Sequence, residues 1–307
     1  MAPHRLRLGL LDFGDLLPGV SPKETVHNSI RAAILAEQLG YSRYWAGEHH
    51  SLADAWGCPE IVLALLAANT KTIRIGTGAI LLPIHSPFRI AEDFSLLENL
   101  FPGRIDLGVG RGSPAFPPNI PPLVDGKPEI SHKDKLSLLC MLLLNALPAD
   151  HPYFGARAIP TPAKAPEVWL LAATFQGAML AAALGLPLGL SIFHVGSKDE
   201  PELIGAYRRA FKPSRLAEKP KWLVAVAGTC CASEAEAAAA IAQHDNPWFV
   251  PKVCGSPQHC KEKFWDFARR YQTEEIMFYD VAKQAADREK SCKLLAHELN
   301  LSHGDAN

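Results

Sequence analysis

The sequence has no block of charge of one sign. Its 307 residues carry 31 Lys and Arg against 32 Asp and Glu, which gives a formal net charge of -1. Proteins that bind nucleic acids or anionic membrane surfaces through charge concentrate basic residues on one segment or face. The sequence therefore supports neither class, and we expect no nucleic acid and no membrane among the partners.

Long apolar runs are missing as well. The longest ones, such as EIVLALLAANT (60–70), fall short of the ~18 residues that a membrane-spanning helix needs. The apolar run near the N-terminus is broken by Asp12 and has no small-residue cleavage site of the signal-peptide kind. We therefore expect a cytoplasmic protein.

Paired cysteines and metal-ligand spacings are also absent. The seven cysteines are odd in number and form no CxxC pair, so the expected state is free thiols in a reducing compartment. The chain contains no HExxH, and its first apolar run contains no HxH. These are spacings that hold catalytic zinc, so no metal site is predicted.

What the sequence does contain is an alternation of short apolar runs and helix-forming segments. The first helix is predicted from Ser21 as N-cap, through Pro22 in its first turn, to a stop at Gly40. A small hairpin is expected in the turn-rich stretch 148–166, and an extra helix at 257–271 before the last unit. The predicted strands are 5–13, 42–50, 72–82, 104–112, 167–174, 186–193, 221–228 and 274–280.

Eight strand–helix units without a long linker predict an α/β fold, a closed (β/α)8 TIM barrel that forms one domain over 1–307. The alternative, an open doubly wound sheet, places a GxGxxG loop directly after its first strand. The sequence has DFGDLLPGV there, which favours the barrel.

Active sites of such barrels lie at the C-terminal ends of the strands. Four successive predicted strands end in polar or glycine-rich groups: Glu48-His49-His50, then Gly78-Ala79 leading to His85, then the 108–112 run GVGRG, then Ala173-Thr174. A single histidine at a strand end is more often structural than catalytic. Side chains alternate in direction along a strand. If His49 faces the barrel mouth, Glu48 and His50 therefore point toward the helices, where they could brace the loop.

Two of these groups suggest a phosphate site. Arg111 lies between glycines that let a ligand approach the backbone, and a guanidinium suits a phosphate. Thr174 precedes a predicted helix, whose first N–H groups attract anions. Because both follow neighbouring strands, Arg111 and the start of the helix at 175–185 could bind one phosphate together.

Three segments carry a family resemblance: YWAGEHHS (44–51), the run from Thr72 to Gly112, and VWLLAATFQGAMLAAALGLPLGLS (168–191). They resemble the flavin-dependent luciferase-like monooxygenases, most densely over 5–112 and again over 167–193. The run from Thr72 to Gly112 is the most specific part of this resemblance.

The resemblance implies two cosubstrates, O2 and reduced FMN, and a separate NAD(P)H:flavin reductase that delivers the reduced FMN. In this family the reduced FMN and O2 form a flavin C4a-hydroperoxide, which would oxygenate a small organic substrate. His49 would be the catalytic residue. Gly78 and Ala79, where several members have a non-proline cis peptide, would back the flavin ring. The phosphate would be bound by Arg111, Ala173, Thr174 and Gly177.

Some positions depart from the family pattern. Bacterial luciferase has Glu-Ser where this chain has Ala173-Thr174, so part of the polar contact would come from the backbone. The long loop after the seventh strand is missing, and a differently built lid is expected at 113–131. In VCGSPQHC, Ser256 is predicted to cap a helix. By position alone, the substrate-facing candidates are Asp12, Phe13, Ile192 and His194.

Three alternatives remain open at this stage: a deazaflavin-dependent oxidoreductase of the same superfamily, a non-catalytic flavin-binding subunit, and a metal hydrolase on the same barrel. Family members often pair through helices near the second and third strands. The predicted helix at 87–100 could therefore serve a homodimer, although a core-facing role explains its apolar residues Phe88, Ile90, Phe94, Leu96 and Leu97 equally well.

Overall fold

The strands close into a barrel in the computed structural model, which describes residues 5–112, 123–124 and 130–301. All pairings between the strands of this part of the chain are parallel, and β10 pairs with both β8 and β1, which closes the ring. The predicted eight-stranded α/β barrel is confirmed. Its strands are β1 (Arg7–Asp12), β2 (Arg43–Ala46), β3 (Arg74–Thr77), β5 (Ile105–Gly110), β6 (Glu167–Ala172), β7 (Leu188–Ser191), β8 (Trp222–Cys230) and β10 (Glu275–Asp280).

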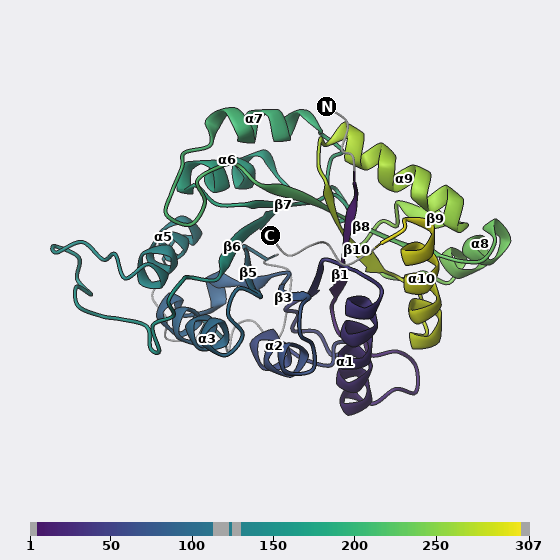
Figure 1. Ribbon diagram of the computed structural model, residues 1–307, viewed down its shortest axis with the longest axis horizontal. Helices are drawn as coiled ribbons and strands as arrows, with labels where there is room; N and C mark the ends of the chain where they lie inside the picture. Colours follow the sequence, from purple (N-terminus) through teal and green to yellow (C-terminus); the bar gives the residue numbers. More distant parts are fainter. Residues whose placement is uncertain (1–4, 113–122, 125–129, 302–307) are drawn as a thin grey trace.

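The helices surround this barrel (Figure 1). The predicted caps are present: Ser21 accepts from the Glu24 N–H, and Ser256 accepts from the His259 N–H. A serine oxygen at this position satisfies one of the N–H groups that a helix start leaves unpaired. The helices are α1 (Pro22–Gln38), α2 (Pro59–Ala68), α3 (Pro87–Leu100), α5 (His132–Leu143), α6 (Phe175–Leu184), α7 (Glu202–Ala210), α8 (Glu234–Ala242), α9 (Pro257–Arg270) and α10 (Ala285–Glu298).

Alternate residues of each strand belong to two different apolar layers. On β1, Leu8 and Leu10 pack outward with the helices, whereas Leu11 and then Phe13 pack inside the barrel. Trp45 and Trp169 fill the inside from β2 and β6. The two-residue period of a strand produces this division, and it decides which side chains can reach the C-terminal mouth.

One local prediction is wrong, and two segments differ in detail from what the sequence predicts. The stretch 148–166 contains turns and bends but no strand, so the predicted hairpin is wrong. It contains five prolines, which cannot donate to a strand ladder. The structure divides the predicted strand 72–82 into β3 and the short strand β4 (Ile80–Leu81), which the 3-10 helix η1 (Leu82–Ile84) follows. It also has a short strand, β9 (Val253–Gly255), just before α9. Most of the expected lid at 113–131 lies outside the described residues.

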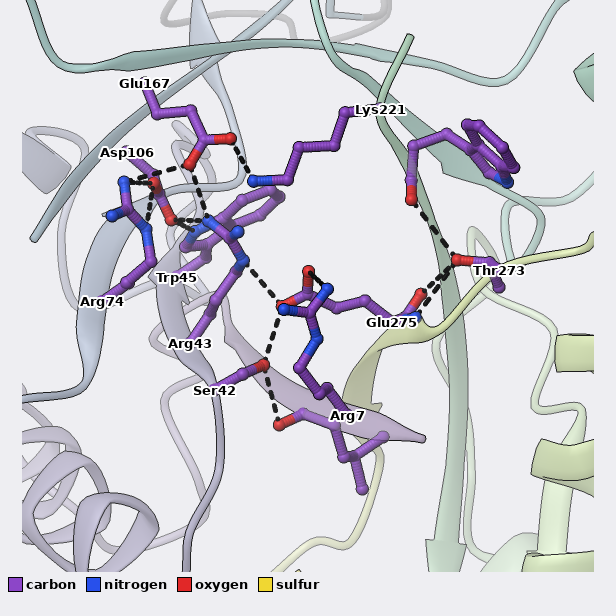
Figure 2. Close-up of polar contacts among 12 residues, drawn as sticks. Arg7, Ser42, Arg43, Trp45, Arg74, Asp106, Glu167, Lys221, Thr273 and Glu275 are labelled. Carbon is purple, nitrogen blue, oxygen red and sulfur yellow. Dashed lines mark hydrogen bonds and ion pairs between the residues drawn. The ribbon is translucent and has the colours of Figure 1, made fainter. Parts of the chain in front are cut away.

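The N-terminal end of the barrel holds a buried ionic network (Figure 2). Arg43, 3% exposed, contacts Asp106 Oδ2 at 2.5 Å and donates from Nε to Glu275 Oε1 at 2.8 Å. Arg74 binds the other oxygen of Asp106, and Lys221 pairs with Glu167. Each of these residues lies at or next to the start of a strand, so this end is sealed by charge pairs.

Most of the apolar residues of helix α3 that the sequence analysis named face the core. Ile90, Phe94 and Leu97 are buried in the core, whereas Leu96 is 47% exposed. The use of this helix by a second subunit stays a prediction. Among the described residues, no helix combines the length and the hydropathy that crossing a membrane requires.

Candidate functional site

Glu48 connects three segments at the C-terminal end of the barrel. Its Oε1 accepts hydrogen bonds from Nε2 of His50 and Nε2 of His85, both at 2.7 Å, and its Oε2 accepts from the Leu81 N–H at 2.7 Å. Burial raises the pKa of this carboxyl, but the hydrogen bonds from His50, His85 and the Leu81 N–H, together with the charge of His85, leave the pKa below its ordinary value. These contacts agree with the expected bracing role of Glu48 and His50.

His49 turns the other way, toward the barrel interior. Its ring stacks on Phe13 with centroids 4.4 Å apart and planes 6° apart, and its Nδ1 lies 3.9 Å from Asp54 Oδ1. Burial lowers the pKa of His49 to about 4, against the opposing effect of Asp15. The imidazole is therefore neutral near pH 7 and able to accept a proton.

An aromatic cluster surrounds His49 at the mouth. Phe13 contacts Phe249 at 5.3 Å and Tyr279 at 4.9 Å between ring centroids, and Phe193 contacts Phe249 at 5.2 Å. Phe249 comes from the segment between α8 and β9, which pairs with the end of β7 through the hydrogen bond from the Val250 N–H to the Phe193 carbonyl. Sequence reasoning missed Phe249, because no strand or helix pattern marks that segment.

The side chains of the four residues predicted to face the substrate do not all point toward the inside of the barrel. Phe13 belongs to the inner layer, and His194 stacks on Phe193 of that layer at 4.5 Å. Ile192 is fully buried in the outer layer.

Asp12 also faces outward, because its oxygens accept from the Ser29 and Tyr44 hydroxyls and from the Gly14 N–H. The prediction that Asp12 and Ile192 meet a substrate therefore needs correction, because the two-residue period turns both away from the mouth.

His194 resembles His49 in its protonation. Its Nδ1 lies 2.7 Å from the Ser191 hydroxyl oxygen, and burial lowers its pKa to about 4. The mouth thus contains two histidines that are neutral near pH 7, one after β2 and one after β7.

The backbones of β3 and β5 approach each other closely beside the mouth. The Gly78–Ala79 peptide is cis, as in several proteins of the family that the sequence resembles. A Cβ on Gly108 would lie 1.9 Å from the Thr77 carbonyl oxygen, which no side chain can accommodate. Glycine is therefore required at 108, and Ala79 stands half-buried at the rim of this close contact.

The residues suggested for a phosphate follow the neighbouring strands β5 and β6. Arg111 is exposed directly after β5. Thr174 caps α6, since its hydroxyl oxygen accepts from the Gly177 N–H at 3.3 Å. Ala173 lies half-buried between β6 and this cap.

His132, the first residue of α5, was missed by the sequence analysis. Burial and then the charge of Arg111 lower its pKa, so the two side chains are near each other. Its Nδ1 is buried and has no hydrogen-bond partner among the described residues. A cationic group, a helix start and an orphaned ring nitrogen fit a phosphate group.

The described residues contain no group of three or more His, Cys, Asp or Glu side chains suited to a metal ion. The fold and the arrangement at the mouth define an eight-stranded α/β barrel whose candidate site lies at the C-terminal end. Residues 6–291 match the sequence model of the family described as "Luciferase-like monooxygenase". The chain therefore belongs to this family, which implies O2 and an organic substrate.

Individual relatives agree with this membership. The uncharacterized protein YceB of Bacillus subtilis (strain 168) is 35% identical over 310 residues, covering 89% of this chain and 93% of that protein. A luciferase-like monooxygenase of Escherichia coli (strain K12) is 35% identical over 230 residues, covering 74% of this chain and 67% of that protein. The crystal structure of apo-MsnO8 has a TM-score of 0.85 at 29% identity and covers 97% of this chain and 99% of that one.

More distant solved structures share the fold alone. One is the oxygenating constituent of 3,6-diketocamphane monooxygenase from Pseudomonas putida in complex with FMN, with a TM-score of 0.74 at 17% identity and coverage of 96% and 98%. Another is an F420-dependent secondary alcohol dehydrogenase, with a TM-score of 0.68 at 15% identity and coverage of 96% and 99%. Structural neighbours thus include enzymes of both flavin types.

Proposed function

We propose that the protein is the oxygenating component of a two-component FMN-dependent monooxygenase. The proposal rests on two features at the C-terminal end of the barrel. One is the set of groups near the ends of β5 and β6 that could bind a phosphate, and the other is the neutral side chain of His49. A separate NAD(P)H:flavin reductase would supply reduced FMN. When bound, this cofactor supplies the oxygen chemistry, and the protein binds it, orients it and shields it from water.

Each group at the mouth has a part in that proposal. Arg111, His132 and the N-terminus of α6 at Thr174 would bind the phosphate, with Ala173 and Gly177 lining it. Gly78 and Ala79 would back the ring. The aromatic cluster around Phe13 and Phe249 would exclude water, and a neutral His49 would accept a proton from the reacting groups and return it.

The first test compares wild type with His49→Ala. We expect both proteins to bind FMN equally under anaerobic conditions, measured by fluorescence titration. On mixing with O2, the variant should lose oxygenation by about 10²–10⁴-fold, the usual contribution of a general acid or base. Full product formation by His49→Ala, measured by mass spectrometry against a panel of organic compounds, would contradict the assigned role.

A parallel titration with F420 separates the flavin types. Tighter binding of F420 than of FMN, together with hydride transfer and without consumption of O2, would favour the deazaflavin alternative. Absence of both activities with intact FMN binding would favour a non-catalytic flavin-binding subunit.

A further inference from the structure

We propose that Asp54 is a positioning residue that keeps the proton of His49 on Nδ1 and so makes Nε2 the proton-accepting atom. The consequence for catalysis rests on the proposed function, because it uses the role of His49 in oxygenation. The tautomer itself is a property of this chain and can be measured without flavin.

The loop that carries Asp54 is fixed from both sides. It pairs antiparallel with the segment after β1, through hydrogen bonds from the Leu16 N–H to the Ala53 carbonyl and from the Ala55 N–H to the Gly14 carbonyl, both 2.8 Å. Asp54 Oδ2 accepts from the Ser51 N–H at 3.0 Å, and the side chain is only 7% exposed. With Oδ2 held in this way, Oδ1 is the atom that faces His49.

The His49 ring is also restricted. Phe13 lies parallel to it at 4.4 Å, and Phe249 lies beside both rings, with its centroid 6.3 Å from that of His49. Stacking fixes the plane of the imidazole and leaves the choice of protonated nitrogen to its surroundings. A carboxylate next to one ring nitrogen favours the proton on that nitrogen and raises the basicity of the other.

The distance from Nδ1 to Oδ1, 3.9 Å, is about 1 Å longer than a hydrogen bond. Catalytic hydrogen bonds are often long before the substrate complex forms and then shorten.

Burial is the largest influence on the protonation of both members of the pair. Burial lowers the pKa of His49 to about 4 and raises the pKa of Asp54 to about 6. Between these values the pair keeps its proton on Asp54, and above about pH 6 the ionised Asp54 can stabilise the imidazolium that forms when His49 accepts a proton. Four other titratable groups act on His49 through their charge: Asp15 and Glu48 raise its pKa, whereas His194 and His50 lower it.

The direct test is nitrogen NMR of 15N-histidine-labelled protein without flavin, in wild type, Asp54→Asn and Asp54→Glu. We expect His49 of the wild type to be protonated on Nδ1 at pH 7. The Asn variant should shift His49 toward the Nε2–H tautomer, and the Glu variant should retain Nδ1–H because it keeps a carboxylate. The same tautomer in wild type and Asp54→Asn would overturn the inference, whatever the activity.

The kinetic test uses Asp266→Asn on the outer helix α9 as the matched control. Asp54→Asn should lower kcat by about 10- to 100-fold, the usual effect of removing a group that orients a functional histidine, without changing FMN affinity. It should also remove the acid limb of the pH profile near pH 6, which Asp266→Asn should retain. If Asp54→Asn leaves both kcat and the acid limb of the pH profile unchanged, the inference is contradicted. If the wild type has the expected tautomer of His49 but no monooxygenase activity, only the proposed function is contradicted.

Discussion

At the scale of single residues, Glu48 determines how the loop after β2 is held. One carboxylate binds His50 of its own loop, the ring of His85 before α3 and the backbone of Leu81 in β4. These partners are two to 37 positions away in the sequence, so the contact fixes the loop that presents His49 against the neighbouring strand. A buried acceptor with several donors is costly to change, because each donor left unpaired loses its hydrogen bond.

We therefore expect Glu48→Gln to lower the free energy of unfolding by about 1–3 kcal/mol, because an amide brings one acceptor oxygen and a donor in place of two acceptors. Urea denaturation followed by circular dichroism measures this change. Glu289→Gln on α10, whose side chain is 55% exposed, serves as control and should change stability by less than about 0.5 kcal/mol. Equal denaturation midpoints for the two variants would contradict the bracing role.

At the scale of elements, α6 is the helix whose start meets the candidate phosphate site. Thr174 caps it in the same way that Ser233 caps α8, where the hydroxyl oxygen accepts from the Glu236 N–H. The two helices are therefore a matched pair, but only α6 follows β6, next to β5, the strand that Arg111 directly follows. Comparing them separates the stability of a cap from its contribution to ligand binding.

Thr174→Ala and Ser233→Ala should each cost about 1 kcal/mol of stability, the usual cost of losing a cap. Thr174→Ala alone should weaken FMN binding, by about fivefold if the lost interaction is worth about 1 kcal/mol. Fluorescence titration with FMN and urea denaturation measure the two effects. Equal FMN affinity in the two variants would remove α6 from the proposed phosphate site.

The sequence predicted most elements because their signals are local. Ser21 and Ser256 mark helix starts by hydroxyl position alone, and each apolar run corresponds to one barrel strand. The orientation of Asp12 relative to Phe13 could also have been predicted from the two-residue period of their strand, and that of Ile192 from the period along its own strand. Phe249 could not, because its position depends on how an irregular segment folds over β7.

At the scale of the whole molecule, different types of interaction close the two ends of the barrel. The N-terminal end is closed by ion pairs around Arg43, and the C-terminal end by aromatic rings around Phe13 and His49. A buried charge network depends on every partner, because removing one leaves the others desolvated and unpaired. The buried charge network and the candidate functional site thus lie at opposite ends of the barrel, which agrees with the usual arrangement of such barrels.

Arg43→Met should lower the free energy of unfolding by about 3–5 kcal/mol, because Asp106 and Glu275 would keep their burial and lose their common partner. Arg89→Met on α3, whose side chain is 71% exposed, should cost no more than about 1 kcal/mol although it also removes two ion-pair contacts. Urea denaturation of both variants tests this contrast. A small effect of Arg43→Met would show that the network contributes little to stability.

Low pH should weaken the same ionic network and so lower the stability of the fold. Burial raises the pKa of Glu275, but the charges of Arg43 and Arg7 outweigh it and bring the pKa from the ordinary 4.5 to about 2. The folded protein thus holds this proton more weakly than the unfolded chain, so the contribution of Glu275 is complete above about pH 4.5 and is lost as the pH falls toward 2. Urea midpoints between pH 7 and 3 should fall for wild type and fall less for Arg43→Met.

The pairing of β10 with both β1 and β8 also has a consequence for synthesis on the ribosome. Because β10 is the last barrel strand in chain order, the edges of β1 and β8 stay unpaired until residues 275–280 have left the exit tunnel. Open strand edges are templates for pairing with other chains. The nascent protein is therefore most exposed to misassembly just before its final strand emerges, and it would be a natural client of chaperones at that moment.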